Sequence, residues 1–315
     1  YKKAKNSQEM TLAILNARAG CPWNLIVQNT KEFFPFTSEN LFRVFSHRHV
    51  WIPPIVIATF LIVVSVKNYL LFHTLAELVA VMVAILIYVM AWQTHRFSHN
   101  NFFLFIACGY FWIGIMDLVH ALSYKGVNIF PITDSNPATQ IWIASRYCEA
   151  LLLLAAPLLF DRTVNRKILF AGFGVVTAII FTLVIYGFFP DAFIEGVGLT
   201  PFKINSEYII IAILIAALAH MILHRPQMES DVLLLFAAVI ILTIGAELAF
   251  THYVSVYGPA NLTGHIFKIF SYWLLFMAVV RSKLLKPYLE LEKEVAERTM
   301  IESALKESEL QLNSI

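Results

Sequence analysis

The chain has 315 residues, of which 59% are apolar and only 14% are charged, with a formal net charge of +2 and a mean hydropathy of +0.70. Soluble domains carry about 25% charged residues, so this composition excludes a soluble globular enzyme, a disordered protein and a disulfide scaffold. The small net charge gives no electrostatic case for nucleic acid, and we expect no nucleic-acid partner. The three cysteines show neither disulfide nor metal-ligand spacing.

Eight apolar runs are long enough to cross a bilayer as helices, because about 20 mostly apolar residues are needed and a helix satisfies its own backbone polar groups. The runs are continuous, whereas an outer-membrane barrel needs short alternating strands. We therefore predict an all-α integral membrane bundle of about eight helices in contact with the lipid bilayer. The runs cover approximately residues 50–66, 72–92, 102–123, 138–160, 167–189, 205–223, 231–253 and 262–285.

The distribution of basic residues predicts the orientation. An even number of spans puts both termini on one side, and lysine and arginine mark the cytoplasmic side. With cytoplasmic termini, eighteen basic residues lie in inner segments and only Lys67, Lys125 and Lys203 lie in outer loops. We expect a multi-pass membrane protein with both termini in the cytoplasm.

The composition divides the chain into three parts. Residues 1–49 are polar to mixed and are predicted to be a cytoplasmic lead-in, either with an interfacial helix or as a poorly ordered tail. Residues 50–285 hold the transmembrane domain. Residues 286–315 are dense in Glu and Lys and are predicted to form a cytoplasmic linker helix.

The linker shows a short heptad pattern. Leu284, Tyr288, Leu291 and Val295 follow a 4-3-4 spacing, which is typical of helices that pair with each other. We predict that the last span continues into a coiled-coil-like helix and that the chain forms a homodimer through it. The end of the chain, ESALKESELQLNSI, resembles the lead-in to PAS domains in bacterial sensor proteins, so we expect an output module to follow.

Ionisable side chains occur toward the outer ends of five spans, where charges are costly and usually mark function. Within four of these spans they lie three, four or seven residues apart, and so on one helix face. If the five faces converge, they form a polar pocket that is reached from the extracytoplasmic side. The predicted ligand-binding residues are His73, Glu77, Asp117, His120, Tyr124, Arg146, Glu149, Glu247, Tyr253 and His265.

Two interpretations of these residues stay open. Arg146 needs a carboxylate partner if it is buried, and it is either a structural ion pair or an anchor for an anionic ligand. The histidines are either interfacial residues or ligands. In the second case His73, His120 and His265 could hold a transition metal or supply axial ligands to haem, which are the two cofactors that we consider.

Four segments, FHTLAELVAVMVA (72–84), GIMDLVHALSYKG (114–126), WIASRYCEALLLLAAP (142–157) and AELAFTHYVSVYGPANLTGHIFKIFSYW (246–273), carry a family resemblance. Together they resemble the third type of membrane-associated sensor domain, the MASE3 type. The resemblance implies an integral-membrane input domain of a bacterial signalling protein, usually followed by PAS, histidine kinase, diguanylate cyclase or phosphodiesterase modules. Residues of this chain that match the family pattern are His73, Glu77, Asp117, His120, Tyr124, Gly126, Trp142, Arg146, Glu149, Glu247, Tyr253, Gly264 and His265.

The functional prediction is a sensory input domain. A small-molecule or metal ligand from the extracytoplasmic side would occupy the polar pocket, and the last span would pass the signal to an output of the two-component or cyclic-di-GMP kind. The segment itself is predicted to be non-catalytic, because no nucleophile–base or zinc motif is visible. The alternatives are a membrane transporter and a haem- or metal-binding redox or gas sensor.

Overall fold

The structure, a computed structural model, describes residues 36–98, 100–130, 134–224, 228–251 and 258–312. The chain forms two compact units, Tyr1–Ser46 and His47–Ile315. The described part of the first unit contains helix α3 (Ser38–Phe45), where Thr37 Oγ1 accepts a hydrogen bond from Asn40 N at 3.2 Å and caps the helix. This short helix lies in the predicted lead-in.

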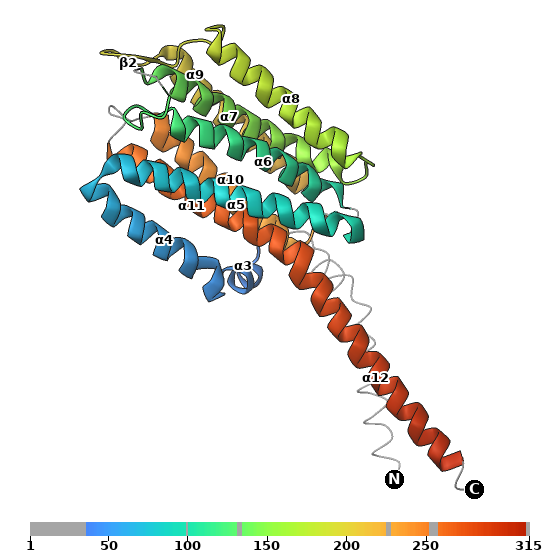
Figure 1. The fold of residues 1–315 in the computed structure, drawn as a ribbon. Helices are drawn as coiled ribbons and strands as arrows, with labels where there is room; N and C mark the ends of the chain where they lie inside the picture. Colours follow the sequence, from blue (N-terminus) through green and yellow to red (C-terminus); the bar gives the residue numbers. More distant parts are fainter. Residues whose placement is uncertain (1–35, 99, 131–133, 225–227, 252–257, 313–315) are drawn as a thin grey trace, which may run out of the picture. The chain divides into compact units, whose positions relative to one another are not determined.

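The second unit is a helical bundle, shown in Figure 1. Among the described residues, eight helices are long and apolar enough to cross a membrane, which confirms the predicted all-α membrane fold. The helices are α4 (Arg48–Lys67), α5 (Tyr69–Ser98), α6 (Asn101–Leu122), α7 (Asn136–Ala155, continued by the 3-10 turn η1, Ala156–Leu159), α8 (Arg166–Ile185), α9 (Pro201–Leu223), α10 (Ser230–Thr251) and α11 (Pro259–Val280).

Short polar residues and prolines set where the helices begin. Asn165 Oδ1 accepts hydrogen bonds from the backbone N–H groups of Lys167 and Ile168 at the start of α8. Thr200 Oγ1 accepts one from Lys203 N at the start of α9, where Pro201 occupies the first helical position. Such caps satisfy N–H groups that have no partner inside the helix, and proline loses nothing there.

The helices divide into central and peripheral ones. Two thirds of the α6 and α7 spans are buried within the protein, against 6% of the α8 span. Helix α8 packs on α6 and α7 at one edge of the bundle, and α4 packs on α5 and α11 at the other edge (Figure 1). The exposed aliphatic side chains of α8, such as Ile168, Val175 and Ile179, therefore face lipid.

A small hairpin interrupts the connection from α8 to α9. Strands β1 (Phe193–Ile194) and β2 (Gly198–Leu199) are antiparallel, with Phe193 opposite Leu199. The turn between them needs glycine, because Gly196 and Gly198 have φ angles of +80° and +106°, where a side chain would be strained. The hairpin lies at the end of the bundle where α7 and α9 begin.

The last span does not stop at the end of the bundle. Helix α11 passes into a five-residue π-helix, η3 (Arg281–Leu285), and then into α12 (Lys286–Leu312) without a break. Arg281 pairs with Asp231 and Lys286 pairs with Glu229, which fixes this junction to the start of α10. The side chains of α12 that the structure describes are exposed, and the helix extends away from the bundle (Figure 1).

Helices α10 and α11 approach closely at Gly264. A Cβ atom on this glycine would lie 2.4 to 2.7 Å from three atoms of the Phe250 ring, which is closer than real Cβ contacts. The Phe250 ring in turn packs edge-on against His265. The absence of a side chain at position 264 therefore sets the position of an aromatic ring beside a buried histidine.

We predict that Gly264→Ala destabilises the protein by about 1–3 kcal/mol, the usual cost of overpacking a core. Thermal unfolding in detergent measures this. The matched control is Gly172→Ala on α8, where nothing lies within 4 Å of an added Cβ, and alanine there leaves stability unchanged or slightly raised. Equal melting temperatures for the two variants would contradict the close packing at Gly264.

Candidate functional site

The predicted site residues lie at one end of the bundle. Helices α5, α7, α9 and α11 begin at this end, and α6 and α10 finish there, because consecutive spans run in opposite directions. The structure brings nine of the ten predicted residues into this region, and eight of these nine side chains are at most 5% exposed. Tyr253 lies outside the described residues, as does His252.

A network of ionised groups forms the deeper part of the site. The Arg146 guanidinium donates to both carboxylate oxygens of Asp117, at 2.8 and 3.0 Å, and to Glu149. Ser145 Oγ donates to Asp117 at 2.7 Å, and Tyr272 Oη donates to its other oxygen at 3.0 Å. The guanidinium thus sits between two carboxylates that come from α6 and from its own helix.

Lys268 joins this network to α5. Its ammonium group lies 2.7 Å from Glu77 Oε2 and 2.9 Å from Asp117 Oδ2. It also lies 4.6 Å from the centre of the Trp142 ring, and Arg146 lies 4.7 Å from that same ring, so both cations are within cation–π range. We call Glu77, Asp117, Arg146, Glu149 and Lys268 the charged layer.

Glu247 faces the charged layer from α10. It lines a cavity of about 10 Å³ together with Arg146, Glu149 and Tyr272.

Close to Glu247, Lys203 and Glu207 on α9 form an ion pair of 2.7 Å in which both side chains are at most 1% exposed. The Lys203 ammonium also donates to the carbonyl of Phe250 at 2.7 Å, so α9 brings a second buried ion pair to the same end.

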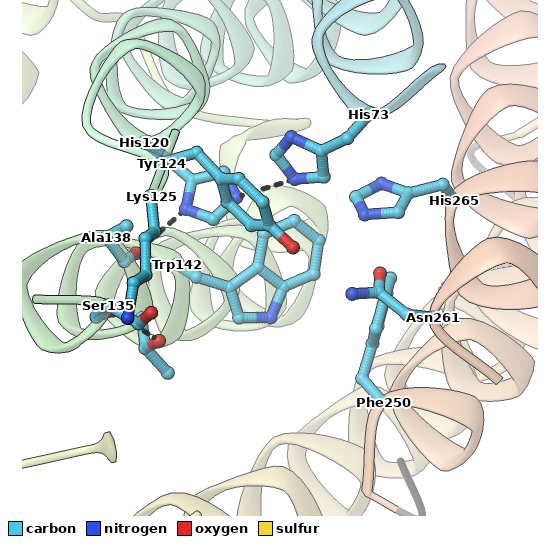
Figure 2. A pocket seen from close by; sticks show the side chains of 11 residues that line it. His73, His120, Tyr124, Lys125, Ser135, Ala138, Trp142, Phe250, Asn261 and His265 are labelled. Carbon is cyan, nitrogen blue, oxygen red and sulfur yellow. Dashed lines mark hydrogen bonds between the residues drawn. The ribbon is translucent and has the colours of Figure 1, made fainter. Parts of the chain in front are cut away.

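Three histidines form a separate layer above the charged one, shown in Figure 2. His73 Nε2 lies 3.4 Å from His120 Nε2, and the His265 ring meets the His73 ring edge-on at 4.8 Å between centres. Tyr124 stacks on His73 with a centre separation of 3.8 Å. We call His73, His120 and His265 the histidine layer.

A cavity of about 30 Å³ borders the histidine layer. This volume exceeds the roughly 10–15 Å³ that one water needs. Trp142, Phe250 and Asn261 complete its wall, and their side chains surround the same space as the histidines in Figure 2. Lys125, which is exposed, lies on the rim, so the cavity reaches the surface at this end of the bundle.

The β1–β2 turn is tied to the rim of this cavity. Glu195 Oε1 accepts from Lys125 Nζ at 2.9 Å and from Ser135 at 3.3 Å through both its backbone N–H and its hydroxyl. These hydrogen bonds lower the pKa of Glu195 below its usual value, so the tie stays ionised at neutral pH. The hairpin therefore contacts Lys125, which follows α6, and Ser135, which precedes α7, and both residues line the cavity.

Sequence reasoning missed several members of the site. It placed Lys203 in an outer loop, but this side chain is buried, and so is the neighbouring Glu207. Lys268 and Tyr272 were not among the predicted site residues. Tyr110, whose hydroxyl donates to Glu149 at 2.8 Å, was not considered, although it lies seven residues before Asp117 and so on the same helix face.

Fold and site together define a multi-pass helical membrane protein with a buried network of ion pairs. Its last transmembrane helix contributes to this network and continues beyond the bundle as α12. The model of the MASE3 family, described as a membrane-associated sensor domain, matches residues 64–287. The match covers most of the chain, from the end of α4 to the start of α12, so the chain belongs to this family and is a membrane-embedded sensor domain. Neither the search of curated proteins nor that of solved structures found a match.

We predict that Arg146→Met lowers the free energy of unfolding by about 3–5 kcal/mol, because it leaves Asp117 and Glu149 buried without their cation. Denaturant or thermal unfolding in detergent checks this in protein without added ligand. The control is Arg298→Met on α12, whose pair with Glu294 is largely exposed and should contribute about 0–1 kcal/mol.

The same measurement separates the two interpretations of Arg146. A guanidinium that serves only to anchor an anionic ligand would leave the stability of the unliganded protein nearly unchanged when it is replaced. A wild-type unfolding curve for Arg146→Met would therefore contradict the structural ion pair.

Proposed function

We propose that this domain detects a signal at the histidine layer from the extracytoplasmic side and passes it through α11 and α12 to a cytoplasmic output module. The bound signal is an ion or small ligand, and the output is a kinase or an enzyme of cyclic-di-GMP turnover. The protein would lie in the inner membrane of a bacterium with both termini in the cytoplasm, and it would act as a homodimer.

The observation that carries the proposal is the continuity of one helix. His265 and Lys268 lie in the first three turns of α11, where they belong to the histidine layer and the charged layer. The same helix then runs through η3 into α12. A change in either layer that rotates or shifts α11 therefore reaches α12 directly, since helices transmit such displacements as rigid elements.

The π-helix η3 is the segment through which a rotation or shift of α11 would pass to α12. Single π-helical turns are rare in proteins, and those that occur frequently lie at functional positions. Here the π-helix lies between the bundle and the exposed helix, and ion pairs from Arg281 and Lys286 hold it to the start of α10. A shift of α11 would act on the Arg281–Asp231 pair before it reaches α12.

Charge supports the proposed orientation. Arg96, Arg162, Arg166, Lys167 and the basic residues of α12 lie at or beyond the ends of helices opposite the histidine layer. At the end with the histidine layer, Lys203 is buried in α9, which leaves Lys67 and Lys125 as the lysines of the predicted outer loops. This difference favours a cytoplasmic side at the α12 end.

An exposed apolar stripe along η3 and α12 supports the homodimer. Leu284, Tyr288, Leu291 and Val295 are all more than half exposed within one chain. A second copy of the helix, packed at heptad positions, would cover this stripe. In the assembled receptor, the signal would then change how two α12 helices meet.

We predict that Leu291→Cys forms disulfide-linked dimers in membranes upon oxidation, in a background whose three native cysteines are replaced by alanine. Lys293→Cys is the control, because position 293 lies on the opposite face of the heptad and should crosslink several-fold more slowly. Gel electrophoresis without reductant measures both rates. Strictly monomeric protein, or equal rates at the two positions, would contradict pairing through α12.

A further inference from the structure

We infer that the histidine layer and Glu77 form a binding site for a single transition-metal ion, with His73, His120, Glu77 and His265 as its ligands. The inference rests on the proposed function for its biological meaning, because it names the signal that the sensor would receive. Binding of the ion can be measured independently of signalling.

The first argument is the spacing of the donor atoms. One donor atom each from His73, Glu77 and His120 lies within 4.8 Å of the other two, and all three residues are buried. The two Nε2 atoms of His73 and His120 are 3.4 Å apart, which is long for a hydrogen bond. Two nitrogens bound to one zinc ion at about 2.0–2.1 Å lie roughly 3.3 Å apart across a tetrahedral angle.

The second argument is the protonation of His120. Its Nδ1 lies 2.8 Å from the carbonyl oxygen of Ala138, which can only accept, so Nδ1 carries the proton. The Nε2 atom of the neutral ring then carries a lone pair that points toward Nε2 of His73. A ring nitrogen that donates to a backbone carbonyl while the other nitrogen faces a metal is the usual arrangement of metal-binding histidines.

The third argument concerns buried atoms that lack hydrogen bonds. Within the part of the chain that the structure describes, His73 Nδ1, Glu77 Oε1 and His265 Nδ1 are buried and have no hydrogen-bond partner. The last two atoms are 3.1 Å apart, and when Nδ1 of His265 carries no proton both are acceptors that cannot bond to each other. Buried polar atoms are costly without partners, and a shared cation would satisfy the carboxylate oxygen and one ring nitrogen together.

Charge favours a cation at this place. The charged layer holds three carboxylates, of Glu77, Asp117 and Glu149, and two basic side chains, of Arg146 and Lys268, so that with all five groups charged and the histidines neutral its formal net charge is −1. The Lys268 ammonium donates to Glu77 Oε2, and Glu77 Oε1 faces His265. A carboxylate held in this way on its far oxygen is a common support for a metal ligand.

The size of the site and its donor set narrow the choice of ion. A cavity of about 30 Å³ holds an ion and a water but no porphyrin, so the histidines suit a bare ion better than haem. Neutral imidazole with one carboxylate favours Zn²⁺, Cu²⁺, Ni²⁺, Co²⁺ or Fe²⁺ over Mg²⁺ and Ca²⁺, which prefer oxygen ligands.

The test uses the full chain in nanodiscs, treated with EDTA and then titrated with Zn²⁺ or Co²⁺ alone. We expect one ion per chain, visible Co²⁺ absorption of a four-coordinate site, and an X-ray absorption spectrum of the Zn²⁺ form with imidazole nitrogens and an oxygen at about 2.0–2.2 Å. In His120→Asn the new amide can still reach the Ala138 carbonyl, whereas Nε2 is lost. We expect His120→Asn and Glu77→Gln to weaken binding by about 100-fold or more.

The matched control is His220→Asn. His220 Nδ1 also lies near a helix carbonyl, that of Leu154 at 2.7 Å, and its ring is 4.6 Å from the ring of His224, so this pair is a competing place for an ion. We expect wild-type affinity in this variant. Loss of the ion in His220→Asn with retention in His120→Asn would overturn the inference, and so would a wild-type protein that binds no ion.

If the His120 or Glu77 variants fail to fold, the wild-type spectrum alone decides, because a Zn²⁺ spectrum without imidazole ligands overturns the site. A separate measurement addresses signalling: the Leu291→Cys crosslinking rate with and without Zn²⁺. Binding at the histidine layer with an unchanged crosslinking rate would contradict the proposed sensing function while the metal site stands.

Discussion

The bundle depends on Arg146 and Lys268, two permanent cations that are at most 3% exposed within a membrane protein. Apolar contact gives membrane helices little reason to prefer one neighbour over another, since lipid is as apolar as the packed side chains. An unpaired buried charge, in contrast, is strongly unfavourable. Arg146 therefore requires Asp117 of α6 beside α7, and Lys268 requires Glu77 of α5 beside α11. These pairs hold four central helices in one arrangement.

The two layers of the polar end differ in the kind of contact that they make. In the charged layer, carboxylates and cations meet at hydrogen-bonding distance, and tyrosine and serine hydroxyls donate to the same carboxylates. In the histidine layer, the Nε2 atoms of His73 and His120 lie 3.4 Å apart, and His265 Nδ1 lies 3.1 Å from Glu77 Oε1. Glu77 and Lys268 connect the two layers, so an event at the histidines acts on the ion pairs that hold α5 to α11.

This connection explains how a buried site of a MASE3 domain would communicate with the exposed helix. A ligand can shift an equilibrium between two arrangements only by its differential affinity for them. A ligand that takes Glu77 Oε1 and His265 would change the contacts at the start of α11 in one arrangement more than in another. Helix α11 continues through η3 to α12. The polar end of the bundle and α12 are thus joined by a single helix rather than by a chain of side-chain contacts.

The sequence by itself determined the class of fold, because eight apolar runs of sufficient length leave few other structures in a bilayer. It also predicted most of the ionisable side chains that the structure brings together at one end of the bundle, since such residues stand out in apolar runs. It placed Lys203 in an outer loop although the side chain is buried, because a charge near the end of an apolar run is assigned to a loop until the burial of that end is known. Only the tertiary structure decided which charges pair, such as Lys268 with Glu77, and which histidine nitrogens face each other. Helix periodicity sets the face of one helix, whereas pairing across residues far apart in the chain depends on the packing of helices against one another.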